Sequence, residues 1–98
     1  MVEKRQHPRR TADIDVVIQS PSGSVSAKSR DLSLGGMFIF TDVTFAFGTK
    51  VSIEIVLPPL GPTKLGATVR WTTSQGVGVQ FDPMGVRETH ALADLTGT

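Results

Sequence analysis

The sequence predicts an all-β fold: a six-stranded antiparallel β-barrel with a flexible basic N-terminal segment and a short C-terminal helix. Apolar residues alternate with polar ones in several short segments, and glycine- and proline-rich connections separate these segments. No long helical pattern lies between them, which favours antiparallel pairing, and closure into a barrel would remove exposed strand edges. The 98 residues suffice for one domain with one core. We therefore expect a segment of residues 1–12 and a barrel domain of residues 13–98.

Three strands are expected in the first half of the chain. Residues 12–19 alternate Ile14, Val16 and Ile18 with a more polar face, and the segment SPSGS then turns the chain. A second strand over residues 25–30 leads into the turn DLSLGG, residues 31–36. The segment MFIFTD then forms a third strand with apolar residues on both faces. The turn therefore joins two strands that are neighbours in the sheet.

Three further strands and a helix are expected in the second half. The segment KVSIEIVLP alternates and ends at a cluster of proline and glycine, and KLGATVRW and GVGVQF follow it. GVGVQF lacks the third glycine and the strand-to-helix context of a dinucleotide-binding loop, so we interpret it as a strand. A helix is expected from Val86 to Leu95, and its apolar stripe should pack against a barrel opening or a partner. That stripe comprises Met84, Ala91, Leu92 and Leu95.

Composition and charge narrow the class of function. Cysteine is absent, which excludes disulfides and thiolate metal sites, and no spacing typical of a metal site occurs. No apolar run is long enough to span a bilayer and no signal peptide is evident, so we expect a cytoplasmic protein without membrane insertion. The net charge is +1, with +3 in residues 1–10, which argues against broad binding to duplex DNA. No histidine is placed as a base for Ser33, so we expect no catalytic residues, no enzyme and no cofactor.

Two polar elements supply the candidate binding residues. RQHPR carries Arg5 and Arg9 in a segment that Pro8 keeps out of a helix. An arginine presents a planar fork of donors suited to O6 and N7 of guanine or to phosphate oxygens. The opposite edge of guanine carries N–H donors that need a carboxylate such as Asp31, and the Ser33 hydroxyl suits the amino group or a phosphate. Together the two elements fit an anionic guanine nucleotide.

Residues next to these two elements are possible further ligand contacts. Gly35 and Gly36 would admit a flat base or a phosphate to the backbone and leave N–H groups pointing outward. Lys4 and Arg10 flank the arginines, where a general electrostatic role is an equal alternative to a phosphate contact.

The aromatic residues are assigned mainly to packing. Trp71 is interpreted as core or barrel-rim packing, in preference to stacking on a ligand. Four phenylalanines should divide between the core and one exposed patch, which is the candidate partner surface. They are Phe38, Phe40, Phe45 and Phe47.

The two elements in order resemble a known family. R-x-x-x-R (Arg5 and Arg9), 21 intervening residues and D-x-S-x-x-G (Asp31, Ser33 and Gly36) are similar to the PilZ domain family of bacterial cyclic di-GMP receptors. The HPR context and the VRW and GVGVQF segments extend the resemblance over nearly the whole chain. The resemblance implies a six-stranded barrel followed by a helix, in agreement with the periodicity. It also implies that Arg5 and Arg9 hold guanine and phosphate from a closing N-terminal segment, that Asp31 and Ser33 bind a guanine, and that Gly36 keeps the turn open.

The expected function is therefore a cyclic di-GMP receptor without catalytic activity, in which ordering of the N-terminal segment alters a surface for an unidentified downstream protein. An alternative is a PilZ-like adaptor that binds its protein partner independently of nucleotide. A third class, a small barrel that binds single-stranded nucleic acid, needs aromatic residues interleaved with basic ones along a groove. Tyrosine is absent and basic residues cluster near the N-terminus, which argues against that class.

Overall fold

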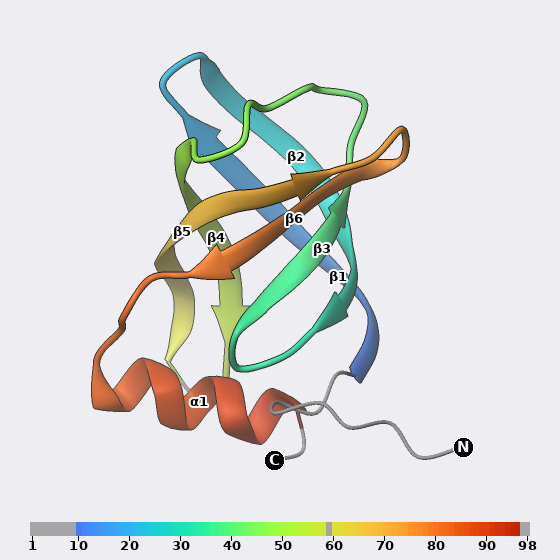
Figure 1. The fold of residues 1–98 in the computed structure, drawn as a ribbon. Coiled ribbons are helices and arrows are strands. Elements are labelled where there is room, and N and C mark those ends of the chain that lie inside the picture. Colours follow the sequence, from blue (N-terminus) through green and yellow to red (C-terminus); the bar gives the residue numbers. More distant parts are fainter. Residues whose placement is uncertain (1–9, 59, 97–98) are drawn as a thin grey trace.

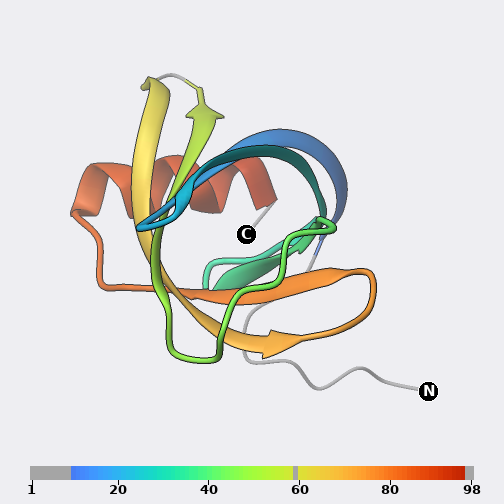
Figure 2. The same cartoon turned by 90° about the horizontal axis from the view of Figure 1, so that it is seen from above.

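The computed structural model describes residues 10–58 and 60–96. These residues form a closed antiparallel barrel followed by a helix (Figure 1). The strands follow one another around the barrel in the order β1-β2-β3-β6-β5-β4, and their closed path is visible from above in Figure 2. The predicted barrel and helix are thus confirmed. The elements are β1 (Arg10–Ser20), β2 (Gly23–Leu32), β3 (Gly36–Phe40), β4 (Lys50–Leu57), β5 (Gly61–Thr72), β6 (Gly76–Phe81) and α1 (Val86–Thr96).

Alternation in the strands builds the barrel interior. In β4, Val51, Ile53 and Ile55 are buried in the core, whereas the residues between them face outward. β3 is buried on both faces over most of its length, as predicted. The barrel closes where Val17–Gln19 of β1 pair with Ser52–Glu54 of β4. One continuous core therefore fills the barrel.

The helix α1 lies across one end of the barrel (Figure 1). Ala91 and Leu92 are buried, and Met84 and Leu95 pack partly buried against the core. The predicted apolar packing is thus confirmed, although Met84 lies before α1, which begins at Val86 and ends at Thr96, one residue later than expected. Within the described ranges, no helix has the length and apolar character needed to cross a membrane.

Strand pairing extends further toward the DLSLGG segment than the sequence indicated. β1 begins at Arg10, inside the segment assigned to residues 1–12, because Arg10 pairs with Leu32 and Thr11 with Asp31. Asp31 consequently lies in β2, and Gly36 begins β3. The turn predicted over residues 31–36 is therefore shorter, because the ladder of hydrogen bonds continues up to Leu32 paired with Met37.

Candidate functional site

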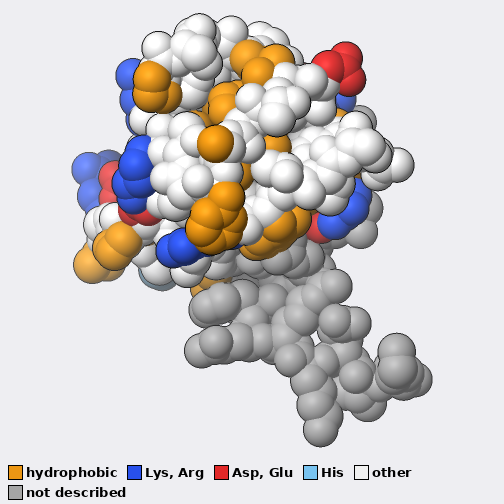
Figure 3. Space-filling model, turned by 45° about the horizontal axis from the view of Figure 1, so that its top comes forward, with side chains coloured by type: hydrophobic (Ala, Val, Ile, Leu, Met, Phe, Trp, Pro, Cys, Tyr) orange, Lys and Arg blue, Asp and Glu red, His pale blue; other side chains and the backbone are white. Residues whose placement is uncertain are grey.

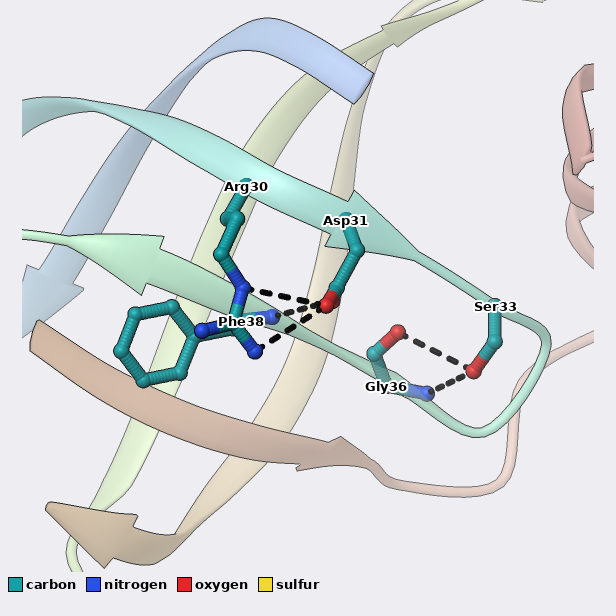
Figure 4. Close-up of polar contacts among 5 residues, drawn as sticks. All are labelled: Arg30, Asp31, Ser33, Gly36 and Phe38. Carbon is teal, nitrogen blue, oxygen red and sulfur yellow. Dashed lines mark hydrogen bonds and ion pairs between the residues drawn. The ribbon is translucent and has the colours of Figure 1, made fainter. Parts of the chain in front are cut away.

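Among the described residues, Asp31 is fixed near the end of β2 by contacts with Arg30 and Phe38 (Figure 4). Its Oδ1 accepts a hydrogen bond from the Phe38 backbone N–H at 3.2 Å. Its Oδ2 accepts hydrogen bonds from Nε and Nη2 of Arg30, both at 3.3 Å. The pairing of β2 with β3 shifts between Ser29 and Asp31, and this bulge brings adjacent residues of one strand to a common face. The carboxylate is therefore held in place before any ligand arrives.

Arg30 and Phe38 form a stacked pair beside this carboxylate (Figure 4). The guanidinium carbon of Arg30 lies 4.2 Å from the centroid of the Phe38 ring, within the range of a cation–π contact. Phe38 is 1% exposed but lies outside the core cluster that fills the barrel. Its ring meets Phe40 edge-on, with centroids 5.8 Å apart. The outer face of the β2–β3 pair thus carries a stacking surface next to Asp31.

The Ser33 hydroxyl is engaged inside the turn. It accepts hydrogen bonds from the backbone N–H groups of Gly35 at 3.2 Å and Gly36 at 3.3 Å, and it donates to the Gly36 carbonyl at 3.3 Å. Ser33 is 2% exposed. The prediction that these two N–H groups point outward is wrong, because both of them donate to the Ser33 hydroxyl. In this geometry the hydroxyl secures the turn that follows Asp31.

Gly36 is required by a neighbouring strand. A Cβ at this position would lie 2.1 Å from the carbonyl oxygen of Val79 in β6, where no side chain fits. The positive-φ glycines of the described chain are Gly23, Gly48 and Gly61, so the turn needs no left-handed glycine. The structure thus gives Gly36 a packing reason, the close approach of β3 and β6, and the role of keeping the turn open for a ligand stays a prediction.

A second hairpin, β5–β6, repeats this geometry. Thr73 Oγ1 accepts hydrogen bonds from the N–H groups of Gln75 at 3.1 Å and Gly76 at 3.2 Å, and a Cβ at Gly76 would lie 2.0 Å from the Ile39 carbonyl. The β5–β6 pairing also shifts, between Val69 and Trp71. Sequence reasoning missed this repeat, although S-x-x-G after β2 and T-x-x-G after β5 are its signature.

The two hairpins differ at the position of the carboxylate. Trp71 pairs with Gly78 as Asp31 pairs with Phe38. Gly78 has no side chain, and the Trp71 indole occupies the space that a Cβ would take. Trp71 is 42% exposed, so it packs on the outside of the barrel and not in its core.

The arginine motif adjoins this site along the chain. Lys4, Arg5 and Arg9 lie outside the described residues. Arg10 is the first residue of β1, and the pairing of Thr11 with Asp31 sets the start of that strand beside the carboxylate. In the chain, the segment with Arg5 and Arg9 therefore directly precedes a strand that begins next to Asp31.

The phenylalanines divide as predicted between buried and exposed positions. Phe38 and Phe45 are buried, whereas Phe40 and Phe47 are 43% and 70% exposed. Phe40 and Val43 line a pocket of about 420 Å³ together with Val25. Figure 3 shows hydrophobic side chains reaching the surface on the face turned forward.

A family model matches nearly the whole chain. The model of the PilZ domain matches residues 3–97. The chain belongs to the PilZ domain family. No curated protein sequence matches it.

Solved PilZ structures are similar in fold. The PilZ domain of Escherichia coli YcgR with c-di-GMP superimposes with a TM-score of 0.78 at 14% identity, covering 97% of this chain and 90% of that one. The PilZ domain of CeSA from a cellulose-synthesizing bacterium gives 0.73 at 20% identity, covering 91% and 94%. The Bacillus subtilis inhibitor of motility MotI superimposes with a TM-score of 0.77 at 22% identity. The match covers 97% of this chain and 50% of MotI, so this chain spans about half the length of MotI. At these identities the likeness establishes the fold.

Proposed function

We propose that this PilZ domain is a receptor for cyclic di-GMP that performs no chemistry. The observation that carries the proposal is the pairing of Thr11 with Asp31, because it joins the arginine segment to the barrel beside a preorganised carboxylate. The chain is also similar to the YcgR PilZ domain, whose structure contains c-di-GMP.

The chemistry of the two elements suits the two edges of guanine. Asp31 accepts from the N1–H and N2–H donors of one base. Arg5 and Arg9 donate to the acceptor edge of guanine and to phosphate, with Lys4 and Arg10 adding positive charge. In this proposal Ser33 and Gly36 contribute by shaping the turn, and Gly35 lies between them as part of that turn. A cyclic dinucleotide offers two bases and two phosphates to offset the entropy of ordering the N-terminal segment.

A chain of aromatic contacts connects this site with the candidate partner surface. Arg30 stacks on Phe38, and Phe38 packs edge-on against the half-exposed Phe40. Phe40 in turn lines the pocket near Val43. A ligand that changes the contacts of Asp31 therefore changes the packing of a surface offered to a downstream protein.

Titration calorimetry with cyclic di-GMP tests the proposal on the full chain. The native protein should bind with a dissociation constant of about 1 μM, which corresponds to about −8 kcal/mol. Arg5→Ala, Arg9→Ala and Asp31→Ala should each weaken binding by about tenfold or more. The matched control is Asp15→Ala, which removes an exposed carboxylate that pairs with Lys28 on the same β1–β2 pair. Undetectable binding to the native chain at tens of micromolar would refute the proposal.

A nucleotide-independent adaptor is the second candidate. The observation that favours it is the repeat of the Ser33 and Gly36 geometry at Thr73 and Gly76, which supports a folding role for this half of the motif. Under this alternative, Arg5→Ala and Arg9→Ala leave capture of a protein partner unchanged. Under the receptor proposal, the same variants abolish the effect of cyclic di-GMP on that capture.

A further inference from the structure

Arg30 brings to Asp31 a donor pair of the kind that a guanine base carries. Nε–H and Nη2–H of Arg30 are neighbouring donors on one planar N–C–N unit, and both reach Asp31 Oδ2 at 3.3 Å. The N1–H and N2–H donors of guanine have the same arrangement on a planar N–C–N unit. The guanidinium thus presents to this carboxylate the donor pair of the base that the carboxylate is proposed to bind.

Arg30 also occupies a stacking position. Its guanidinium carbon is 4.2 Å from the Phe38 ring centroid, so the guanidinium covers the ring face on which a planar base could stack. Phe38 is itself anchored to Asp31, because its backbone N–H donates to Oδ1. The Arg30 side chain therefore both donates to the Asp31 carboxylate and lies over the Phe38 ring (Figure 4).

We propose that Arg30 is an internal competitor for the guanine-binding carboxylate, which it occupies in the ligand-free protein and must release before the base binds. This inference rests on the proposed function. It identifies an affinity-determining residue that precedes the D-x-S-x-x-G motif and that sequence reasoning missed.

The strength of the contact makes release feasible. The Arg30 side chain is 51% exposed, whereas that of Asp31 is 12% exposed. Solvent screens an ion pair of this kind, and the stacked contact adds a comparable amount. Competition of this size lowers the affinity for ligand by about fivefold, since each factor of ten corresponds to about 1.4 kcal/mol. The arginine therefore raises the ligand concentration needed for occupancy without blocking the site.

The test compares two arginine-to-lysine changes by calorimetry with cyclic di-GMP. Arg30→Lys keeps the positive charge but removes the planar fork. It should bind about fivefold more tightly than the native chain. The control is Arg70→Lys at the equivalent position of β5, where Nε of Arg70 donates to Gln80 Oε1 at 2.8 Å. Its affinity should stay within about twofold of native.

Each outcome separates the competitor from the receptor proposal. If the native chain binds cyclic di-GMP and Arg30→Lys binds it equally or more weakly, the competitor proposal is wrong and the receptor proposal stands. No binding by either chain overturns both. Binding by Arg30→Lys but not by the native chain supports the competitor and contradicts the receptor proposal for the native protein. Urea unfolding of both variants ensures that folded proteins are compared.

Discussion

The β2–β3 and β5–β6 hairpins share one framework and differ in the side chains that it presents. In both, the strand pairing is shifted and a side-chain hydroxyl accepts hydrogen bonds from two backbone N–H groups. Both also contain a glycine that lies close to a backbone carbonyl of the neighbouring strand. The first presents Asp31 beside Phe38, whereas the second presents Trp71 over Gly78. The S-x-x-G or T-x-x-G part of the pattern therefore builds a hairpin in both places, and the aspartate is the part that the second hairpin forms without.

The largest expected effect follows from adding a methyl group at the two equivalent glycines. Gly36→Ala and Gly76→Ala should each lower the free energy of unfolding by about 3 kcal/mol, because the new Cβ meets a backbone carbonyl. Urea unfolding measures this. Gly66→Ala is the control, since its nearest contact is the movable Asp82 carboxylate at 3.0 Å. Tolerance of alanine at one of the two positions alone would break the equivalence.

Loss of the two turn hydroxyls should give unequal effects. Ser33→Ala should cost about 2 kcal/mol of unfolding free energy, because the buried Gly36 N–H and the half-buried Gly35 N–H lose their acceptor. Thr73→Ala should cost about 1 kcal/mol or less, because Thr73 is exposed and water replaces the hydroxyl. Ser33→Thr retains the hydroxyl as a control. Equal losses at both positions would argue that burial does not distinguish the turns.

One difference between the hairpins predicts a stabilising change. Ser29 is 1% exposed, and within the described chain its hydroxyl has no hydrogen-bond partner; Val69 holds the equivalent place in β5. Ser29→Ala should raise the free energy of unfolding by about 1 kcal/mol, because it removes a buried unsatisfied group. Thermal and urea unfolding test this, with the exposed Ser26→Ala as control. A lower stability would mean that the hydroxyl is satisfied.

The packing of Trp71 against Gly78 can be tested by tryptophan fluorescence. Gly78→Ala would place a Cβ within 1.8 Å of the Trp71 indole, so the half-exposed ring should move into solvent. We expect a red shift of tryptophan emission and a loss of about 1 kcal/mol in unfolding free energy. Gly66→Ala serves again as the control. Unchanged emission would show that the indole does not depend on Gly78.

The smallest effect is expected just beyond the second hairpin. A hydrogen bond from the Lys50 ammonium to Asp82 lowers the pKa of this carboxyl below 3.8. A lowered folded-state pKa stabilises the protein above about pH 4, and this contribution is lost as the pH falls through the folded pKa. Asp82→Asn should therefore cost less than about 1 kcal/mol at pH 7 and nothing in strong acid. The exposed Asp42→Asn is the control, and an Asp82→Asn effect that persists in strong acid would contradict the mechanism.

Much of the fold follows from local pattern. The alternation in β4, the stripe on α1 and the strand character of GVGVQF were all predicted, because periodicity fixes which face of an element a residue occupies. For the candidate site, the sequence indicated Asp31 and its motif but gave no sign of the contact between Arg30 and Phe38. Their contact depends on the bulge between β2 and β3, which shifts the pairing and leaves no mark in the alternation.

The sequence by itself determined the barrel, the helix and the motifs that place this chain in the PilZ domain family. The tertiary structure decided why particular residues stand where they do. It assigned Gly36 to the approach of β6, the Ser33 hydroxyl to its own turn, and Arg30 to Asp31. The physical reason is that residue types and periodicity are local properties. Contacts between strands depend on register and closure, which are set when the whole barrel assembles.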